Sequence, residues 1–341
     1  MSTYRVAQVA TAGGPFELAE REVPQPGPGQ VRIAVDACGI CRSDAMFVNA
    51  ALPGVGFPVV PGHEIAGRVE VLGDGAEDQG WQAGDRVAVG WFGGSCGHCT
   101  PCRQGDFVVC DNLKVPGWAY DGGYAEAVIV PTGALAWIPG SLTAADAAPL
   151  ACAGVTVFNG LRCSSARHGD LVAVLGIGGL GHLAVRYAVA MGYETVAIAR
   201  GAAKSDFAEQ LGAHHYIDST AGTPVAEALQ SLGGAKVVLA TAANSAAIAA
   251  TVDGLSHRGE LVVIGADSEP LGINPAQLIM RSRTVRGHAS GTAQDIQDTM
   301  EFSALHGIRP MIEVLPLNRA GEAYDKMLSG AARFRMVLTT G

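Results

Sequence analysis

The stretch LVAVLGIGGLGHLAVRYAVAMG, residues 171–192, contains the pattern that decides the fold. Its first five residues, Leu171–Leu175, form an apolar run that is typical of a buried strand. Apolar side chains then recur at helical offsets from Leu180 to Met191, and Gly192 is a typical helix stop. The stretch therefore predicts a buried strand that is followed at once by a helix.

Strand-like and helix-like segments continue to alternate after this stretch. Further strands are expected at Thr195–Ala199, His215–Asp218, Val237–Thr241 and Leu261–Gly265, with helices around Ser205–Leu211, Pro224–Leu232 and Ala246–Leu255. This alternation predicts an α/β domain with a parallel, doubly wound sheet of the Rossmann type. After about Thr284 the alternation fades, and one helix is expected at Thr292–His306. The periodicity leaves open whether the tail adds more sheet or returns to the first domain.

The first 150 residues have a different texture. Short alternating runs bounded by Gly or Pro predict strands at Val31–Ala37, Ile65–Leu72 and Arg86–Val89. A β-rich domain is therefore expected here. A chain of 341 residues also exceeds what one hydrophobic core usually organises, which favours two domains.

The composition excludes several classes of protein. Apolar residues make up 48% of the chain and charged residues 16%, which is the reverse of a disordered protein. A net charge of −9 argues against nucleic-acid binding by phosphate neutralisation. The N-terminus lacks a secretory signal pattern, and no stretch has the ~18 uninterrupted apolar residues of a membrane span. We expect a cytoplasmic protein with no nucleic-acid partner and no membrane partner.

Glycines occupy the turn between the strand and the helix of the opening stretch. They are Gly176, Gly178 and Gly181, with Gly179 and Leu180 between them. Such a turn lets the backbone approach a pyrophosphate, and the helix N-terminus offers unpaired N–H groups to it. The turn predicts a dinucleotide site; the alternative is a tight strand–helix turn without a ligand.

The end of the next strand bears on which dinucleotide is bound. A carboxylate ~20 residues after the glycines would accept hydrogen bonds from a ribose hydroxyl and repel a 2′-phosphate. Here the strand ends with Ala199 and Arg200, followed by Lys204, and a guanidinium suits a phosphate. The sequence favours NADP over NAD. The alternative is that Arg200 is a solvated surface charge and that both cofactors are accepted.

Four of the eight cysteines lie close together: Cys96, Cys99, Cys102 and Cys110. Four thiolates in a glycine-rich loop can surround one zinc ion tetrahedrally, and such a closed shell leaves no position for a substrate. The cluster predicts a structural zinc. An iron–sulfur site, which also uses four cysteines, is the alternative.

Three further candidates are ordinary when they are taken one by one: Cys41, His63 and Cys152. A lone His or Cys in an apolar stretch is more often packing than ligand, and Cys38 with Cys41 has the spacing of a redox pair. Their weight comes from a resemblance. In the segment Gly62-His63-Glu64-x2-Gly67-x5-Gly73, the cysteine cluster, the glycine turn and the Cys152 turn, the chain resembles the zinc-containing medium-chain alcohol dehydrogenases. This resemblance covers essentially the whole chain.

The resemblance implies a GroES-like catalytic domain at residues 1–150, completed by 287–341, and a Rossmann domain at 151–286. It implies a zinc-dependent oxidoreductase with two zinc ions per chain, which transfers hydride between primary alcohols or aldehydes and NADP or NAD. A homo-oligomer, dimer or tetramer, is expected from family habit. The alternatives are a zinc-free reductase of the same superfamily, which usually lacks both metal sites, and a non-catalytic nucleotide or zinc sensor.

By position in the family, Cys41, His63 and Cys152 are implied to bind the catalytic zinc. Glu64 is implied to be a carboxylate that can approach the metal when ligands exchange. Asp44 is implied to be the partner that fixes the tautomer of His63. The Cys152 ligand favours simple primary alcohols, because polyol dehydrogenases of the family more often have Glu there.

Other implied roles concern the cofactor, the proton and the substrate. Arg42 and Arg335 match positions that hold the cofactor pyrophosphate, and Ser43 is placed to accept the alcohol proton. Many members continue this proton path with a histidine where this chain has Met46, so the proton must leave by another route. Trp91 and Trp118 fall in segments that often line the substrate cleft in the family, and Phe47 and Leu52 are expected to add apolar wall; the alternative for such an aromatic is a core position.

Overall fold

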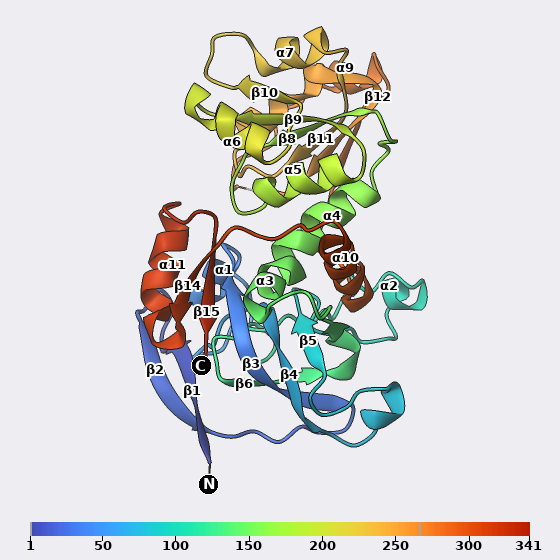
Figure 1. Ribbon diagram of the computed structural model, residues 1–341. Helices are drawn as coiled ribbons and strands as arrows, with labels where there is room; N and C mark the ends of the chain where they lie inside the picture. Colours follow the sequence, from blue (N-terminus) through green and yellow to red (C-terminus); the bar gives the residue numbers. More distant parts are fainter. Residues whose placement is uncertain (1, 266) are drawn as a thin grey trace. The chain divides into compact units, whose positions relative to one another are not determined.

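The computed structural model describes residues 2–265 and 267–341, which divide into two compact units (Figure 1). One unit comprises Met1–Val155 and Ser290–Gly341, and the other comprises Thr156–Ala289. We call them the catalytic unit and the nucleotide unit.

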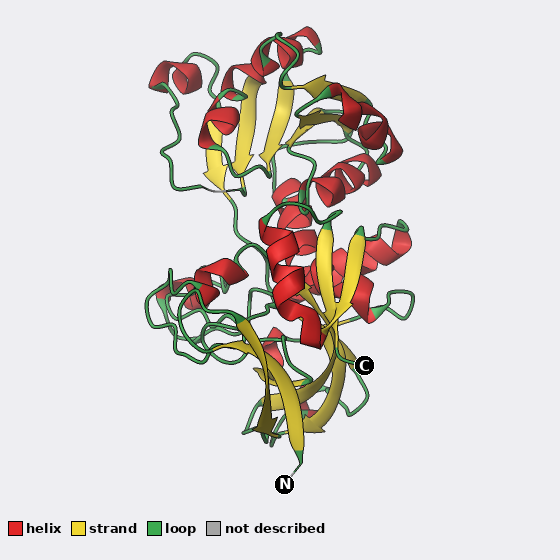
Figure 2. Ribbon diagram, turned by 90° about the vertical axis from the view of Figure 1, so that its left-hand side faces the viewer, coloured by secondary structure: helices red, strands yellow, loops and turns green. Residues whose placement is uncertain are grey.

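The nucleotide unit is built on one sheet. Its strands are β8 (Leu171–Leu175), β9 (Glu194–Ala199), β10 (His215–Asp218), β11 (Ala235–Ala240), β12 (Leu255–Val263) and β13 (Thr284–Gly287). They are all parallel and lie in the order β10-β9-β8-β11-β12-β13. Helices lie on both sides of the sheet (Figure 2), which confirms the predicted doubly wound fold. Because both faces are covered, all five residues of β8 are buried, as its continuous apolar run predicts.

The helices of this unit are short. They are α4 (Val155–Arg162), α5 (Gly181–Ala190), α6 (Ser205–Gln210), α7 (Val225–Ser231), α8 (Ser245–Ala249) and α9 (Pro275–Ile279). The single helix expected at Ala246–Leu255 is wrong, because α8 ends early and a separate 3-10 turn, Val252–Gly254, leads into β12. Gly254 packs tightly on α7, since a Cβ there would lie 2.6 Å from Leu229 Cδ1. This close contact favours the turn over a continued helix.

The catalytic unit contains a hairpin and a larger sheet. The hairpin is β1 (Thr3–Val9) with β2 (Phe16–Glu22). The larger sheet has the order β14-β15-β3-β4-β5-β7, with β6 also paired to β3. Its strands are β3 (Gln30–Ile40), β4 (Glu64–Leu72), β5 (Arg86–Val89), β6 (Ala127–Pro131), β7 (Ala136–Trp137), β14 (Ile312–Pro316) and β15 (Arg335–Thr339).

The C-terminal tail returns to this sheet. β15 pairs antiparallel with β3, with Met336 opposite Ile40, and β14 extends the sheet beyond it. In Figure 1 the red β15 lies beside the blue β3, and β14 lies on the other side of β15. The tail therefore completes the first domain, the second of the two possibilities that the periodicity leaves open.

The catalytic unit also contains helical segments besides its short 3-10 turns. They are α1 (Asp44–Val48), α2 (Thr100–Arg103), α3 (Ala144–Pro149), the π-helical turn Leu150–Gly154, α10 (Ala293–Leu305) and α11 (Ala320–Leu328). The helical stretch Ala144–Arg162 is long and apolar enough to cross a membrane, with a mean hydropathy of 1.2. However, 78% of the tested window is buried inside the protein, as in a core helix.

Three glycines of the turn between β8 and α5 differ in what a side chain would meet at their positions. Gly176 has a φ of +96°, which an L-residue rarely adopts. A Cβ on Gly181 would lie 1.8 Å from the carbonyl oxygen of Gly176, so that helix and turn approach too closely for any side chain. A Cβ on Gly178 would meet nothing within 4 Å. The fold alone therefore explains Gly176 and Gly181 but not Gly178.

We expect Gly181→Ala to destabilise the nucleotide unit by about 3 kcal/mol, because overpacking against backbone forces the turn apart. Gly178→Ala is the matched control and should leave the thermal unfolding midpoint unchanged. Thermal unfolding and amide exchange of β8 and α5 measure both effects. Equal losses in the two variants would contradict this explanation.

Candidate metal and cofactor sites

Cys41 and His63 are neighbours because of the register between β3 and β4. β3 ends one residue before Cys41, and β4 begins one residue after His63. The two strands are antiparallel, with Gly39 opposite Glu64, so the end of one strand meets the start of the other. The approach requires a glycine, since a Cβ on Gly39 would lie 2.0 Å from Glu64 Oε2.

Cys152 reaches the same place from the π-helical turn, a type of irregularity that is frequent at functional sites. Gly90, directly after β5, lets that strand approach the turn closely. A Cβ on Gly90 would lie 2.0 Å from the carbonyl oxygen of Ala151. Because β5 pairs with β4, Cys152 lies beside the start of β4, and its Sγ is 3.4 Å from His63 Nε2.

Asp44 orients His63. The carboxylate has no exposed surface, and its Oδ1 lies 2.9 Å from Nδ1 of His63. Its Oδ2 accepts a 2.9 Å hydrogen bond from the N–H of Cys41. Nδ1 therefore donates to Asp44, and Nε2 faces the sulfurs. Burial lowers the pKa of His63, but the charges of Asp44 and Cys41 outweigh it and raise that pKa well above its usual value.

The ligand atoms of Cys41, His63, Glu64 and Cys152 all lie within 4.8 Å of one another. Tetrahedral zinc with bonds of ~2.0 Å to nitrogen and ~2.3 Å to sulfur separates its ligand atoms by about 3.3–3.8 Å. A hydrogen bond with Cys152 lowers the pKa of Cys41 well below its usual value, which favours the thiolate that zinc requires. Two sulfurs and an imidazole nitrogen therefore fit a zinc ion in both spacing and chemistry.

Two aromatic rings pack around His63. The Trp91 ring meets it edge-on with centroids 5.0 Å apart, and the Phe47 ring lies 6.1 Å away. Phe47 is fully buried and stacks on Trp91, so it is a core residue. Leu52 and Trp118, which are half-buried, pack against the same core. Of the four residues expected at the substrate cleft, only Phe47 and Trp91 have ring contacts with His63 among the described residues.

Glu64 forms an ion pair with Arg335, the first residue of β15. Both side chains are buried. Burial raises the pKa of Glu64 to about 7, against the lowering influence of Arg335. Glu64 Oε2 and Arg335 Nε have no hydrogen-bond partner among the described residues. The positive charge of Arg335 therefore compensates the charge of the Glu64 carboxylate, and the Nε–H group of Arg335 has no hydrogen-bond partner among the described residues.

The turn before α1 carries the other residues expected near the reaction. Arg42 is exposed, and Ser43 is half-buried. The Ser43 hydroxyl does not cap α1, so it is available to another group. Met46 is half-buried on the same turn, and its N–H donates to the Ser43 carbonyl.

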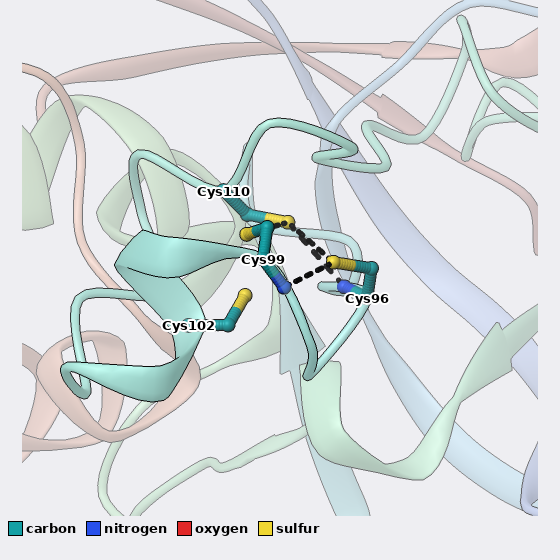
Figure 3. A group of neighbouring side chains, drawn as sticks. All are labelled: Cys96, Cys99, Cys102 and Cys110. Atoms are coloured by element: carbon teal, nitrogen blue, oxygen red, sulfur yellow. Dashed lines mark hydrogen bonds between the residues drawn. The ribbon is translucent and has the colours of Figure 1, made fainter.

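The four clustered cysteines face one another (Figure 3). Cys110 Sγ lies 3.6 Å from Cys96 Sγ and 3.8 Å from Cys99 Sγ, and all four sulfurs lie within 4.8 Å. The N–H groups of His98 and Cys99 lower the pKa of Cys96 to about 5. The spacing matches a zinc tetrahedron of four sulfurs.

In the nucleotide unit, Arg200 and Lys204 are exposed just after β9, whose last residue is Ala199. Sequence reasoning missed two residues of β10 that hold this loop. Asp218 Oδ1 accepts a 2.8 Å hydrogen bond from the Gly201 N–H, and the Tyr216 hydroxyl donates to the Gly201 carbonyl at 2.7 Å. The only signal in the sequence was the predicted parallel sheet, in which the ends of neighbouring strands lie at one edge; the structure shows that β10 is the strand that pairs with β9.

Comparisons with known proteins agree with these sites. Residues 27–140 match the family described as alcohol dehydrogenase GroES-like domain, and residues 179–304 match zinc-binding dehydrogenase. Alcohol dehydrogenase patD of Penicillium expansum is 42% identical over 338 residues, which cover 99% of this chain and 98% of that protein.

Two solved structures are similar over 99% of this chain. The protein named CAD from Helicobacter pylori, complexed with NADP(H), has a TM-score of 0.86 at 27% identity, with 98% of its chain covered. A NAD-dependent alcohol dehydrogenase has a TM-score of 0.91 at 26% identity, with 100% of its chain covered. This chain therefore belongs to the zinc-type medium-chain alcohol dehydrogenases, enzymes that act on alcohols with a nicotinamide cofactor.

Proposed function

We propose that this enzyme oxidises primary alcohols and reduces the corresponding aldehydes, with a catalytic zinc at Cys41, His63 and Cys152 and with NADP as the preferred cofactor. The observation that carries the proposal is the convergence of two sulfurs and one imidazole nitrogen beside the buried Asp44. Three protein ligands leave a fourth position open for a substrate oxygen. When bound, zinc supplies a Lewis acid that eases deprotonation of an alcohol and polarises a carbonyl in the reverse direction.

The residues around this site have separate tasks. Asp44 keeps the proton of the His63 imidazole on Nδ1, so that the electron pair of Nε2 is available to bind the zinc ion. The hydroxyl of Ser43, which does not cap α1, lies two residues after Cys41. It hydrogen-bonds the alcohol oxygen and relays its proton to the ribose and water or to another base. The Trp91 ring covers one side of the imidazole.

Glycines and cations support binding of the cofactor pyrophosphate. No protein atom lies within 4 Å of where a Cβ of Gly178 would stand, and this free space supports the close approach of a pyrophosphate to the backbone of the turn before α5. Gly179 and Leu180 continue this turn toward the N-terminus of α5. Arg42 is exposed and Arg335 keeps an unused donor, which supports their role as cations for a pyrophosphate.

The exposed Arg200 and Lys204 support NADP, because two cations suit the 2′-phosphate. One observation favours NAD as a second candidate. Hydrogen bonds from Thr220 and Gly201 lower the pKa of Asp218, which keeps a negative charge beside the loop that bears Arg200. NADP is favoured because Arg200 and Lys204 supply two positive charges, whereas the single carboxylate, Asp218, is already hydrogen-bonded to the Gly201 N–H group.

The four-cysteine cluster is proposed to hold a second, structural zinc. Its shell of Cys96, Cys99, Cys102 and Cys110 is complete without a substrate, so it stabilises the loop and takes no part in the reaction. The Trp91 and Phe47 rings beside His63 support an apolar substrate, a small alcohol or aldehyde. The homo-oligomer implied by the family remains a prediction.

Metal analysis should find about two zinc ions per chain. We expect Cys110→Ser to lose one zinc and to lower the thermal unfolding midpoint, because a structural zinc contributes folding energy. Cys152→Ser should lose the other zinc and reduce turnover by at least ~1000-fold, since the Lewis acid supplies several kcal/mol. Cys163→Ser, at an exposed cysteine, is the control and should keep both ions. Less than one zinc per chain in the wild type would refute the proposed mechanism.

Initial rates with NADP and NAD test the cofactor. We expect Arg200→Asp to lower kcat/KM for NADP by about 10- to 100-fold, because it removes a charge-assisted hydrogen bond and adds repulsion. The value for NAD should stay the same or rise. Arg167→Asp reverses a charge on an exposed residue before β8 and should leave the ratio unchanged. A wild-type preference for NAD, or an unchanged ratio in Arg200→Asp, would argue against the assigned role.

The pH profile of kcat tests the proton path. With Met46 in the position of the usual histidine, we expect no ionisation near the ~6.5 typical of histidine. Met46→His should introduce one. If the wild type shows such an ionisation and loses it when another histidine is replaced, the path runs through that histidine.

A further inference from the structure

We propose that Tyr124 is a positioning residue for the metal site, whose hydroxyl fixes the carboxylate of Asp44 and, through it, the ligand nitrogen of His63. This inference rests on the zinc site proposed above. It assigns a role to a residue that neither the motifs nor the family resemblance singles out.

The contact is direct and fully buried. The hydroxyl of Tyr124 donates a 2.9 Å hydrogen bond to Asp44 Oδ2, and neither side chain is exposed. Oδ2 also accepts from the N–H of Cys41, whereas Oδ1 faces Nδ1 of His63. The two neutral donors thus hold one oxygen in place, and the other oxygen is left for the imidazole. Because burial raises the pKa of Tyr124 well above its usual value, the phenol stays protonated and donates.

The backbone anchors Tyr124 next to His63. The N–H of Tyr124 donates to the Pro61 carbonyl at 3.0 Å, and the N–H of Gly123 donates to the Gly62 carbonyl at 2.8 Å. These bonds attach the Tyr124 segment to the two residues that precede the ligand. Any shift of one segment therefore moves the other.

Packing leaves the ring one place. Gly62 has a φ of +106°, and a Cβ on it would lie 2.4 Å from Tyr124 Cδ1. Phe16 packs on the ring with a centroid distance of 5.9 Å. A ring that cannot shift aims its hydroxyl at a fixed point, and this restricts rotation of the Asp44 carboxylate.

The alternative is that Tyr124 is only a core residue, whose hydroxyl bonds Asp44 because it is buried there and has no effect on the metal site. The two roles differ in the effect of removing the oxygen. A positioning role predicts a change at the metal, whereas a structural role predicts only a change in unfolding. Partners that orient a metal-bound histidine typically contribute 10- to 100-fold to metal affinity. Tyr124 contacts such a partner rather than the histidine itself, so we expect its hydroxyl to contribute about tenfold to zinc affinity.

The test compares Tyr124→Phe with Tyr324→Phe. Tyr324 is a matched control, because its ring packs on the same Phe16 at 5.1 Å and its hydroxyl has no hydrogen-bond partner among the described residues. Release of the Cys152-dependent zinc to a chelator should be about tenfold faster in Tyr124→Phe, and the visible spectrum of the Co²⁺-substituted protein should change. Release from the four-cysteine cluster should not change, and Tyr324→Phe should match the wild type.

A double-mutant cycle with Asp44→Asn sharpens the test. Because Tyr124 is proposed to act through Asp44, the hydroxyl should have little further effect on zinc release once that carboxylate is gone. Additive effects of the two substitutions would overturn the proposal. So would wild-type release and an unchanged Co²⁺ spectrum in Tyr124→Phe.

If Tyr124→Phe does not fold, a second variant tests the same hydrogen bond. 3-Fluorotyrosine at position 124 keeps the ring and makes its hydroxyl a stronger donor, so zinc release should slow and the Co²⁺ spectrum should shift. No change in either would overturn the proposal. If the wild type holds no Cys152-dependent metal, the zinc site and this inference both fall; if that metal is present but insensitive to Tyr124, only this inference falls.

Discussion

The carboxylate of Asp44, which has no exposed surface, accepts hydrogen bonds from three parts of the chain. Cys41 lies after β3, His63 lies before β4, and Tyr124 belongs to a segment that is bonded to the residues before His63. Leaving such a carboxylate without donors would cost several kcal/mol, so the three segments must come together for the unit to be stable. The same interaction that holds the core together also orients the imidazole.

Glycines determine how closely the strands can bring these groups together. Gly39 makes room for Glu64, and Gly90 makes room for the turn that bears Cys152. Neither position needs glycine for its φ; each needs it because another group already occupies the space of a side chain. The strand register and these two contacts together bring distant parts of the chain to one point.

Local patterns in the sequence predicted the Rossmann sheet, because the apolar run and the glycine turn at residues 171–181 depend only on near neighbours. The pairing of Cys41 with His63 depends on strand register, which no spacing along the chain reveals, so only the family resemblance indicated it. Asp218 and Tyr124 were missed for the same reason: each acts across a strand or segment boundary. The expected helix at Ala246–Leu255 failed because packing of Gly254 on α7 overrides the local pattern.

The charges at the site explain why neutral groups support Asp44. Cys41, Cys152 and Glu64 are acidic groups in one largely buried cluster with Asp44 beside them. Arg335 pairs with Glu64, but one cation does not balance several like charges, which cannot all ionise without further compensation. The hydrogen bond between the cysteines accordingly raises the pKa of Cys152 well above its usual value. On the proposed ligation, a divalent cation displaces the thiol protons, so metal binding adds to the stability of the fold. A hydroxyl and an amide donate to Asp44 Oδ2 without adding a second positive charge to that of Arg335, which already pairs with Glu64, and that is a physical reason for a tyrosine, rather than an arginine, at position 124.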